Sequence, residues 1–271
     1  MSLVSTDWLS KNLDKVKIID ATWHLEKNRN AIEEYKNEHI ENALFFDLDK
    51  NSNKNKNLPH GHYLPAINDY EKNISELGIL NTDRIIIYCN SNLISSCRAW
   101  FQFLYFGHDK KLVSILNGGL KKWKYENRKV TNLKTKIISS KYVARENINM
   151  IKTKYQIKMN VKKNDFLLID ARSKNRFLGR APEPRPGVKS GSIKGSKSLP
   201  FNELISLKDN SFLGRKKLKD IFKLLEIDSK EIVMSCGSSV SAATLALAYS
   251  LINNDYIPKI YIGSWTEFGK K

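Results

Sequence analysis

The chain has 271 residues, 41% of them hydrophobic, which is long enough for two domains that each bury a core. It has no run of about 18 apolar residues and no basic start followed by an apolar segment, so we expect no membrane span, no secretory signal and a cytoplasmic location. The net charge of +18 reflects a chain-wide excess of lysine, and we therefore expect no specific nucleic-acid partner.

The cysteine content is low and scattered. The three cysteines are Cys89, Cys97 and Cys236. They are too few for a disulfide framework, and no pair has the CxxC spacing of a zinc site. We expect reduced thiols, no metal and no cofactor.

The first half of the chain alternates apolar and helical segments. Ile18 to Thr22 and Ile85 to Cys89 are predicted strands, and Ser96 to Tyr105 is a predicted helix. A polar stretch at 131–149 is the predicted linker, which gives a first domain at 1–130 and a second at 150–271.

The second half repeats the landmarks of the first. Asp170 follows Asp20 by 150 residues, and Cys236 follows Cys89 by 147. The apolar run that ends at Cys236 is a predicted strand, followed by a predicted helix from Ala242 to Ile252. Strands that alternate with helices predict, in each domain, an α/β fold with a mainly parallel sheet flanked by helices. Ligands of such sheets bind at the carboxyl ends of the strands.

Cys236 is the candidate nucleophile. It lies between a buried strand and a helix, where free backbone N–H groups and the positive end of the helix dipole favour a thiolate. A buried, inert cysteine is the alternative interpretation. The small and hydroxyl residues from Gly237 to Ser241 are typical of a loop and favour the nucleophile.

The sequence from Cys236 to Ser241, Cys-Gly-Ser-Ser-Val-Ser, resembles the active-site loop Cys-Gly-Ser/Thr-Gly-Val-Thr of the 3-mercaptopyruvate sulfurtransferases, which are tandem rhodanese proteins. Arg176 to Arg185 and Tyr261 to Phe268 are similar to two other segments of that family. The resemblance covers nearly the whole chain. It implies two tandem rhodanese-like domains, of which the first is catalytically degenerate. Ser239 replaces the usual glycine, at a cost of about 1 kcal/mol if that position needs positive φ.

Arg176 and Arg185 are the candidate anion-binding residues. They are nine residues apart with two prolines between them, which fits a loop that presents two guanidinium groups. A guanidinium can hold a carboxylate bidentately and polarise a neighbouring carbonyl, which would orient 3-mercaptopyruvate toward Cys236. Solvated loop charges are the alternative, and we expect Arg172 and Arg180 to be such charges or local structural ties.

The resemblance also implies a proton relay. It assigns Ser238, His62 and Asp49 to the movement of a proton between thiol, water and enolate. His60, two residues before His62, is a competitor for the histidine role.

The resemblance implies a persulfide as the intermediate. Sulfur passes from 3-mercaptopyruvate to Cys236, pyruvate leaves, and loop N–H groups hold the outer sulfur. The residues expected to bind it are Gly237, Ser239, Val240 and Ser241. A small thiol, cyanide or a thioredoxin-like protein then accepts the sulfur; the sequence does not choose among them and leaves the oligomeric state open.

Three alternatives to this function remain open. Thiosulfate is the rival donor, although thiosulfate-specific relatives carry basic residues where this chain has Gly237 and Ser238. A rhodanese-like phosphatase would need an arginine at position 242, which is Ala242 here. A basic module that carries persulfide without catalysis is the third. Cys89 is either a second sulfur-receiving thiol or, as we prefer, a packed cysteine at a strand end.

Overall fold

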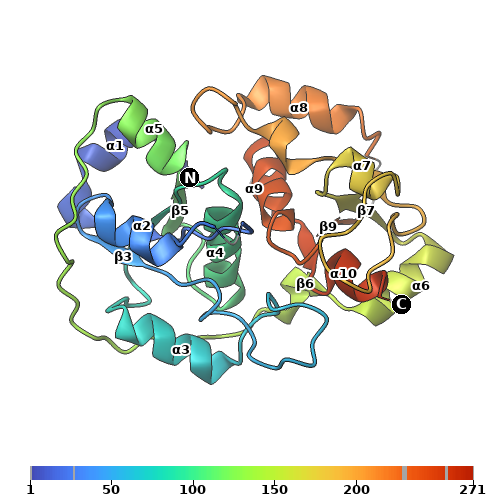
Figure 1. The fold of residues 1–271 in the computed structure, drawn as a ribbon, viewed down its shortest axis with the longest axis horizontal. Coiled ribbons are helices and arrows are strands. Elements are labelled where there is room, and N and C mark those ends of the chain that lie inside the picture. Colours follow the sequence, from blue (N-terminus) through green and yellow to red (C-terminus); the bar gives the residue numbers. More distant parts are fainter. Residues whose placement is uncertain (1, 27, 228–230, 254–255, 271) are drawn as a thin grey trace. The chain divides into compact units, whose positions relative to one another are not determined.

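The computed structural model describes residues 2–26, 28–227, 231–253 and 256–270, which form two compact units (Figure 1). Unit 1 contains residues 2–52, 64–147 and 206–212, and unit 2 contains the other described residues. Each unit is built around a five-stranded parallel sheet, which confirms the predicted α/β class.

Unit 1 orders its strands β1-β5-β4-β2-β3. Its core joins the sheet side chains Ile18, Ile86 and Tyr88 to Trp123. Its elements are β1 (Leu3–Val4), α1 (Thr6–Ser10), η1 (Leu13–Lys15), β2 (Lys17–Asp20), α2 (Ala31–Asn37), β3 (Ala43–Phe45), α3 (Ile67–Glu76), β4 (Ile85–Tyr88), α4 (Ile94–Tyr105), β5 (Val113–Leu116) and α5 (Gly119–Tyr125).

Unit 2 orders its strands β6-β10-β9-β7-β8, the same arrangement position by position. Leu168, Val233, Tyr261 and Trp265 lie in its core. Its elements are η2 (Ile148–Met150), β6 (Ile151–Lys152), α6 (Lys154–Lys163), β7 (Phe166–Asp170), α7 (Lys174–Phe177), β8 (Lys197–Ser198), η3 (Phe201–Leu204), α8 (Arg215–Lys223), β9 (Glu231–Ser235), α9 (Ala242–Ile252), β10 (Lys259–Tyr261) and α10 (Ser264–Phe268).

The central strand of each sheet ends beside a cysteine. β4 is followed by Cys89 and α4, and β9 is followed by Cys236 and α9. These strands are buried along most of their length because helices pack against them, as α4 does on β4 and α9 on β9. The repeat therefore places Cys89 and Cys236 at equivalent positions of two equivalent sheets.

The two units exchange short segments of chain. Residues 53–63 belong to unit 2, although their neighbours on both sides belong to unit 1. Residues 206–212 belong to unit 1, although their neighbours on both sides belong to unit 2. The predicted linker has no helix or strand from 132 to 147, where it forms backbone hydrogen bonds with unit 1, such as Ser140 N to Ser75 O and Arg145 N to Phe106 O. The limits at 130 and 150 stay predictions.

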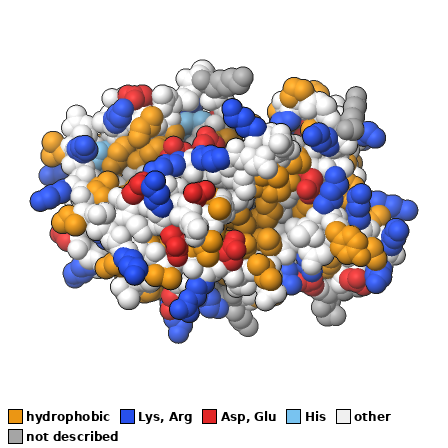
Figure 2. All heavy atoms as spheres, turned by 90° about the horizontal axis from the view of Figure 1, so that it is seen from below, with side chains coloured by type: hydrophobic (Ala, Val, Ile, Leu, Met, Phe, Trp, Pro, Cys, Tyr) orange, Lys and Arg blue, Asp and Glu red, His pale blue; other side chains and the backbone are white. Residues whose placement is uncertain are grey.

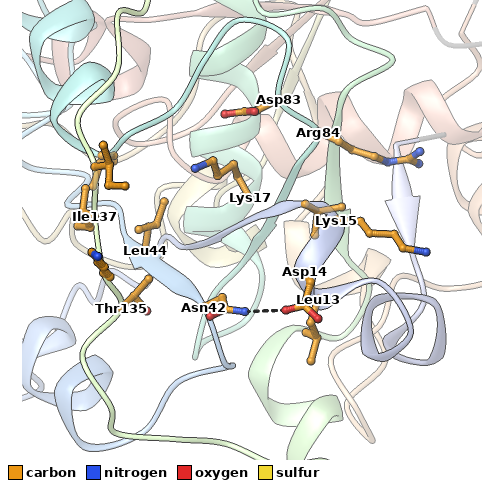
Figure 3. Close-up of a pocket in the computed structure, with 14 residues that line it drawn as sticks. Leu13, Asp14, Lys15, Lys17, Asn42, Leu44, Asp83, Arg84, Thr135 and Ile137 are labelled. Atoms are coloured by element: carbon orange, nitrogen blue, oxygen red, sulfur yellow. Dashed lines mark hydrogen bonds between the residues drawn. The ribbon is translucent and has the colours of Figure 1, made fainter.

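A cavity of about 400 Å³ lies in unit 1, and Cys89 is not among the residues that line it (Figure 3). Lys17 at the start of β2 and Arg84 just before β4 line it, so it opens at the amino ends of the parallel strands. Asn42 donates a hydrogen bond to Asp14 at its rim, at 3.3 Å. The cavity therefore lies at the end of the sheet opposite Cys89, which follows the carboxyl end of β4.

Equivalent aspartates end the second strand of each sheet but have different partners. Asp170 is paired with Arg172 at 2.8 Å. Asp20 accepts hydrogen bonds from the backbone N–H and hydroxyl of Thr22 instead. Burial raises the pKa of Asp20 to about 6, although the hydrogen bonds from Thr22 and Tyr88 and the charge of His39 oppose the shift.

The raised pKa of Asp20 predicts a loss of stability with rising pH. Below pH about 3.9, the pKa of an unfolded Asp, Asp20 is protonated in both the folded and the unfolded protein. Between that pH and about pH 6 it ionises only in the unfolded protein, so the free energy of unfolding falls as the pH rises. Above pH 6 the free energy of unfolding has fallen by its full amount, about 3 kcal/mol. We expect Asp20→Asn to be more stable than the unaltered protein at pH 7.5 and to lose this pH dependence, measured by urea unfolding at pH 5 and pH 7.5.

The repeat supplies the control for this measurement. Asp170→Asn removes one of the two carboxylates paired with the buried Arg172, and we expect it to be less stable at both pH values. If Asp20→Asn also destabilises the protein equally at both pH values, its carboxyl is a needed hydrogen-bond acceptor and the predicted titration is wrong.

Candidate active site

Cys236 is buried at the end of β9, with 2% of its surface exposed. The residues after it form a loop that leads into α9, whose 11 residues are long enough to present a helix dipole. α9 begins at Ala242, so the positive end of its dipole lies at the end of the loop that follows Cys236. Its expected effect on the Cys236 thiol stays a prediction.

The loop after Cys236 is fixed by the start of α10. The backbone N–H of Trp265 donates to Cys236 O at 2.9 Å, and that of Thr266 donates to Gly237 O at 3.1 Å. The buried hydroxyl oxygen of Ser264 accepts from the N–H groups of Cys236, at 3.4 Å, and Ser239, at 2.9 Å. No sequence pattern indicated this role of Ser264.

These contacts decide which amides can face a bound sulfur. Ser239 is taken, because its N–H donates to Ser264. Among the described residues, the amides of Gly237, Ser238, Val240 and Ser241 have no acceptor within the protein. Of the loop N–H groups predicted to bind the outer sulfur, these four are available as donors. The Ser239 N–H, which was also predicted to bind it, is not, because it already donates to Ser264.

Ser239 has left-handed backbone geometry, with φ of +60°. The sequence raised this possibility because related loops have glycine there. An L-residue in this region is strained, by roughly 1 to 2 kcal/mol. The Ser239 hydroxyl also contacts the His62 carbonyl oxygen, at 3.4 Å, which a glycine could not do.

Arg176 and Arg185 both lie against the loop. A Cβ atom added to Gly237 would be 3.1 Å from Arg176 Nη2 and 3.8 Å from Arg185 Nη1. Arg185 Nη2 donates to Ser238 Oγ at 3.2 Å. Burial lowers the pKa of Arg185, and attraction to Cys236 opposes that shift. The two guanidinium groups predicted from the sequence therefore converge beside Gly237.

Glu183 joins the arginines of this unit into one network. It accepts from Arg176 Nε and Nη2, at 3.1 and 2.5 Å, and from Arg172 Nη1, at 2.6 Å. Arg172 is buried and also donates to Asp170 and to Gly191 O, so it is the structural tie that the sequence suggested. The sequence analysis missed Glu183, although it lies between the two prolines of the arginine-bearing stretch.

His62 contacts the hydroxyl of Ser238, with 3.0 Å between Nδ1 and Oγ. Arg185 can only donate to that oxygen, so the hydroxyl hydrogen is available to His62 Nδ1. Both residues belong to unit 2, because residues 53–63 are part of it. The serine and histidine of the predicted relay are thus brought together. His60 contacts Ile262 O through Nε2 and accepts from the backbone N–H of His62 through Nδ1.

Asp49 and Cys89 lie in unit 1. Asp49 accepts hydrogen bonds from the Trp23 indole, at 3.2 Å to each carboxylate oxygen, and its part in the relay stays a prediction. Cys89 is fully buried, with its sulfur 3.3 Å from Ser91 Oγ and 3.5 Å from Ser96 Oγ. Its packing favours the interpretation of a strand-end cysteine.

Figure 2 shows Lys and Arg side chains scattered over one face among acidic and apolar ones, without a continuous stripe. Within the described ranges, no three His, Cys, Asp or Glu side chains are placed to hold a metal. No described helix is both long and apolar enough to cross a membrane.

Comparisons with known proteins agree along the whole chain. The rhodanese-like domain family model matches residues 5–126 and 153–271. The chain is 38% identical to thiosulfate/3-mercaptopyruvate sulfurtransferase 1, mitochondrial, of Arabidopsis thaliana (98% of this chain, 75% of the relative). It is 34% identical to 3-mercaptopyruvate sulfurtransferase of Mus musculus (98% and 91%).

The fold is similar to that of a solved relative. The crystal structure of SseA from Escherichia coli, described as showing the rhodanese fold of 3-mercaptopyruvate sulfotransferases, superposes with a TM-score of 0.86 at 31% identity. The match covers 98% of this chain and 99% of that one. Length, domain order and fold therefore coincide.

Proposed function

The chain belongs to the rhodanese family, and from this premise we propose that it is a sulfurtransferase that takes sulfur from 3-mercaptopyruvate onto Cys236. The observation that carries the proposal is the convergence of Arg176 and Arg185 beside Gly237, the residue next to Cys236. The relatives named for this activity match nearly the full chain.

The guanidinium pair suits a donor that has a carboxylate next to a carbonyl. Arg185 has one nitrogen toward Gly237 and another on Ser238, whereas Arg176 has one edge bound to Glu183 and its Nη2 beside Gly237. A carboxylate and keto oxygen held by this pair leave the thiol of 3-mercaptopyruvate directed at Cys236.

The transfer balances without an added oxidant. The Cys236 thiolate forms an S–S bond to the donor sulfur, the donor C–S bond breaks, and its electron pair stays on carbon as the enolate of pyruvate. The hydrogen of the donor thiol moves to that carbon, and we assign Ser238 and His62 to its passage. The products are pyruvate and the Cys236 persulfide, whose outer sulfur faces the loop amides.

The second half of the reaction passes the outer sulfur to an acceptor. A small thiol, cyanide or a thioredoxin-like protein can take the outer sulfur by attack on it. A cytoplasmic location stays a prediction from the sequence.

Thiosulfate is the second candidate donor, because the Arabidopsis relative is named for both donors. Here Gly237 and Ser238 supply no positive charge, and a side chain at 237 would approach Arg176 Nη2. We expect faster thiocyanate formation from cyanide with 3-mercaptopyruvate than with thiosulfate at equal concentration. Turnover with thiosulfate but not with 3-mercaptopyruvate would overturn the donor assignment. No turnover with either donor would overturn the proposed sulfurtransferase activity.

A further inference from the structure

The backbone of His62 is held on both sides by side chains of unit 2. Its N–H donates to His60 Nδ1 at 3.0 Å, and its carbonyl oxygen accepts from Ser239 Oγ at 3.4 Å. Exposure of His60, His62 and Ser239 is 6%, 4% and 0%. We propose that His60 and Ser239 are positioning residues that clamp the His62 backbone and so hold its imidazole against Ser238.

The local chain explains why such a clamp is needed. Residues 53–63 contain no helix or strand, and their ends are joined by Asn53 N donating to Tyr63 O at 2.9 Å. Gly61 precedes His62, and a Cβ there would meet nothing within 4 Å, so this point has the freedom of an unpacked glycine. Without side-chain contacts, the imidazole would have no regular backbone to fix its position.

The side chain of His60 accepts from the backbone N–H of His62 in a single tautomer. Because Nδ1 accepts from the His62 N–H, Nε2 carries the hydrogen and donates to Ile262 O at 3.1 Å. The ring also stacks on Tyr63, with 4.4 Å between centroids and 25° between planes. These contacts fix one neutral tautomer and tie residues 60–63 to the end of β10.

Ser239 supplies the other side of the clamp at the expense of backbone strain. Its φ of +60° suits glycine, the residue of related loops, yet the hydroxyl reaches His62 O. Strain held at a functional loop is evidence of a role for the residue that bears it. Ser238 and Ser239 thus contact His62 through its side chain and its backbone.

The test rests on the proposed use of His62 in sulfur transfer and compares two replacements of His60. His60→Phe keeps a ring for Tyr63 but has no acceptor, whereas His60→Asn offers an amide oxygen that can cap the N–H two residues on, as in an Asx turn. We expect kcat with 3-mercaptopyruvate to fall about tenfold in His60→Phe and to recover in His60→Asn, with KM unchanged because Arg176 and Arg185 are untouched. Ser239→Ala should lower kcat by a smaller factor.

A second readout needs no sulfur donor. In ¹⁵N-histidine-labelled protein, we expect His60 as the neutral Nε2–H tautomer, and we expect the His62 ring signals to move in His60→Phe but not in His60→Asn. A His60 in another protonation state, or equal losses in both variants, would overturn the clamp. If His60→Phe does not fold, Ser239→Ala tests the clamp in its place. An unchanged kcat together with unchanged His62 signals in Ser239→Ala would overturn the clamp.

The two readouts separate this inference from the function on which it rests. An unchanged kcat in His62→Ala would refute the proton relay, and absence of sulfur transfer in the unaltered protein would refute the sulfurtransferase. In either case the tautomer of His60 and the ring signals of His62 would still test the clamp.

Discussion

Replacing Cys236 with serine is expected to reduce sulfur transfer from 3-mercaptopyruvate to cyanide by about 10³-fold or more, because the sulfur that carries the persulfide is lost. The residue is the one cysteine at the site, at the end of β9 beside the two arginines. Thiocyanate formation measures the rate, and the intact mass after donor treatment shows whether one sulfur atom has been added.

Cys89→Ser is the matched control for this variant. Cys89 holds the equivalent position in unit 1, where its sulfur contacts the hydroxyls of Ser91 and Ser96, which a serine can also bond. We expect this variant to keep its rate and its added sulfur. An added sulfur that survives Cys236→Ser and disappears in Cys89→Ser would show that the first unit carries the persulfide.

Arg185→Lys is expected to lower kcat/KM for 3-mercaptopyruvate by about 10²-fold. Lysine keeps the charge but cannot contact Ser238 and a substrate oxygen together, as the Arg185 fork can. A loss of charge-assisted hydrogen bonds worth about 1.5 to 3 kcal/mol each corresponds to roughly 10- to 100-fold or more. Steady-state pyruvate release measures the effect.

The neighbouring arginines provide controls of graded strength. Arg176→Lys should have a smaller effect, since one edge of that guanidinium is already bound to Glu183. Arg180→Lys should have none, because Arg180 is exposed. Equal losses in Arg185→Lys and Arg180→Lys would mean that general charge, not a built site, attracts the donor.

The sequence predicted the parts of the fold that depend on local burial. The predicted strands Ile18 to Thr22 and Ile85 to Cys89 correspond to β2 and β4, which end at Asp20 and Tyr88, and the apolar run before Cys236 is β9. Such runs mark strands because a parallel sheet covered by helices buries most side chains of its central strands. The predicted helix from Ala242 to Ile252 matches α9, which begins where the loop of hydroxyl residues ends.

Contacts between residues far apart in the sequence could not be predicted from the sequence. The capping of the catalytic loop by Ser264 depends on a left-handed serine, with φ of +52°, that no periodicity marks. Glu183 was missed because a carboxylate between prolines looks like a solvated loop charge until the two arginines are seen around it. His62 was found only through the family resemblance.

The exchange of segments between the units bears on how the chain is made. Unit 1 is completed by residues 206–212, where Asp209 pairs with Lys122 at 2.9 Å and Phe212 N donates to Asn117. A ribosome releases those residues only after most of unit 2 has been synthesised, so unit 1 cannot finish folding as an isolated first step. A gene fragment for the second half alone would likewise encode Cys236 without His62, the histidine that contacts Ser238 in its loop.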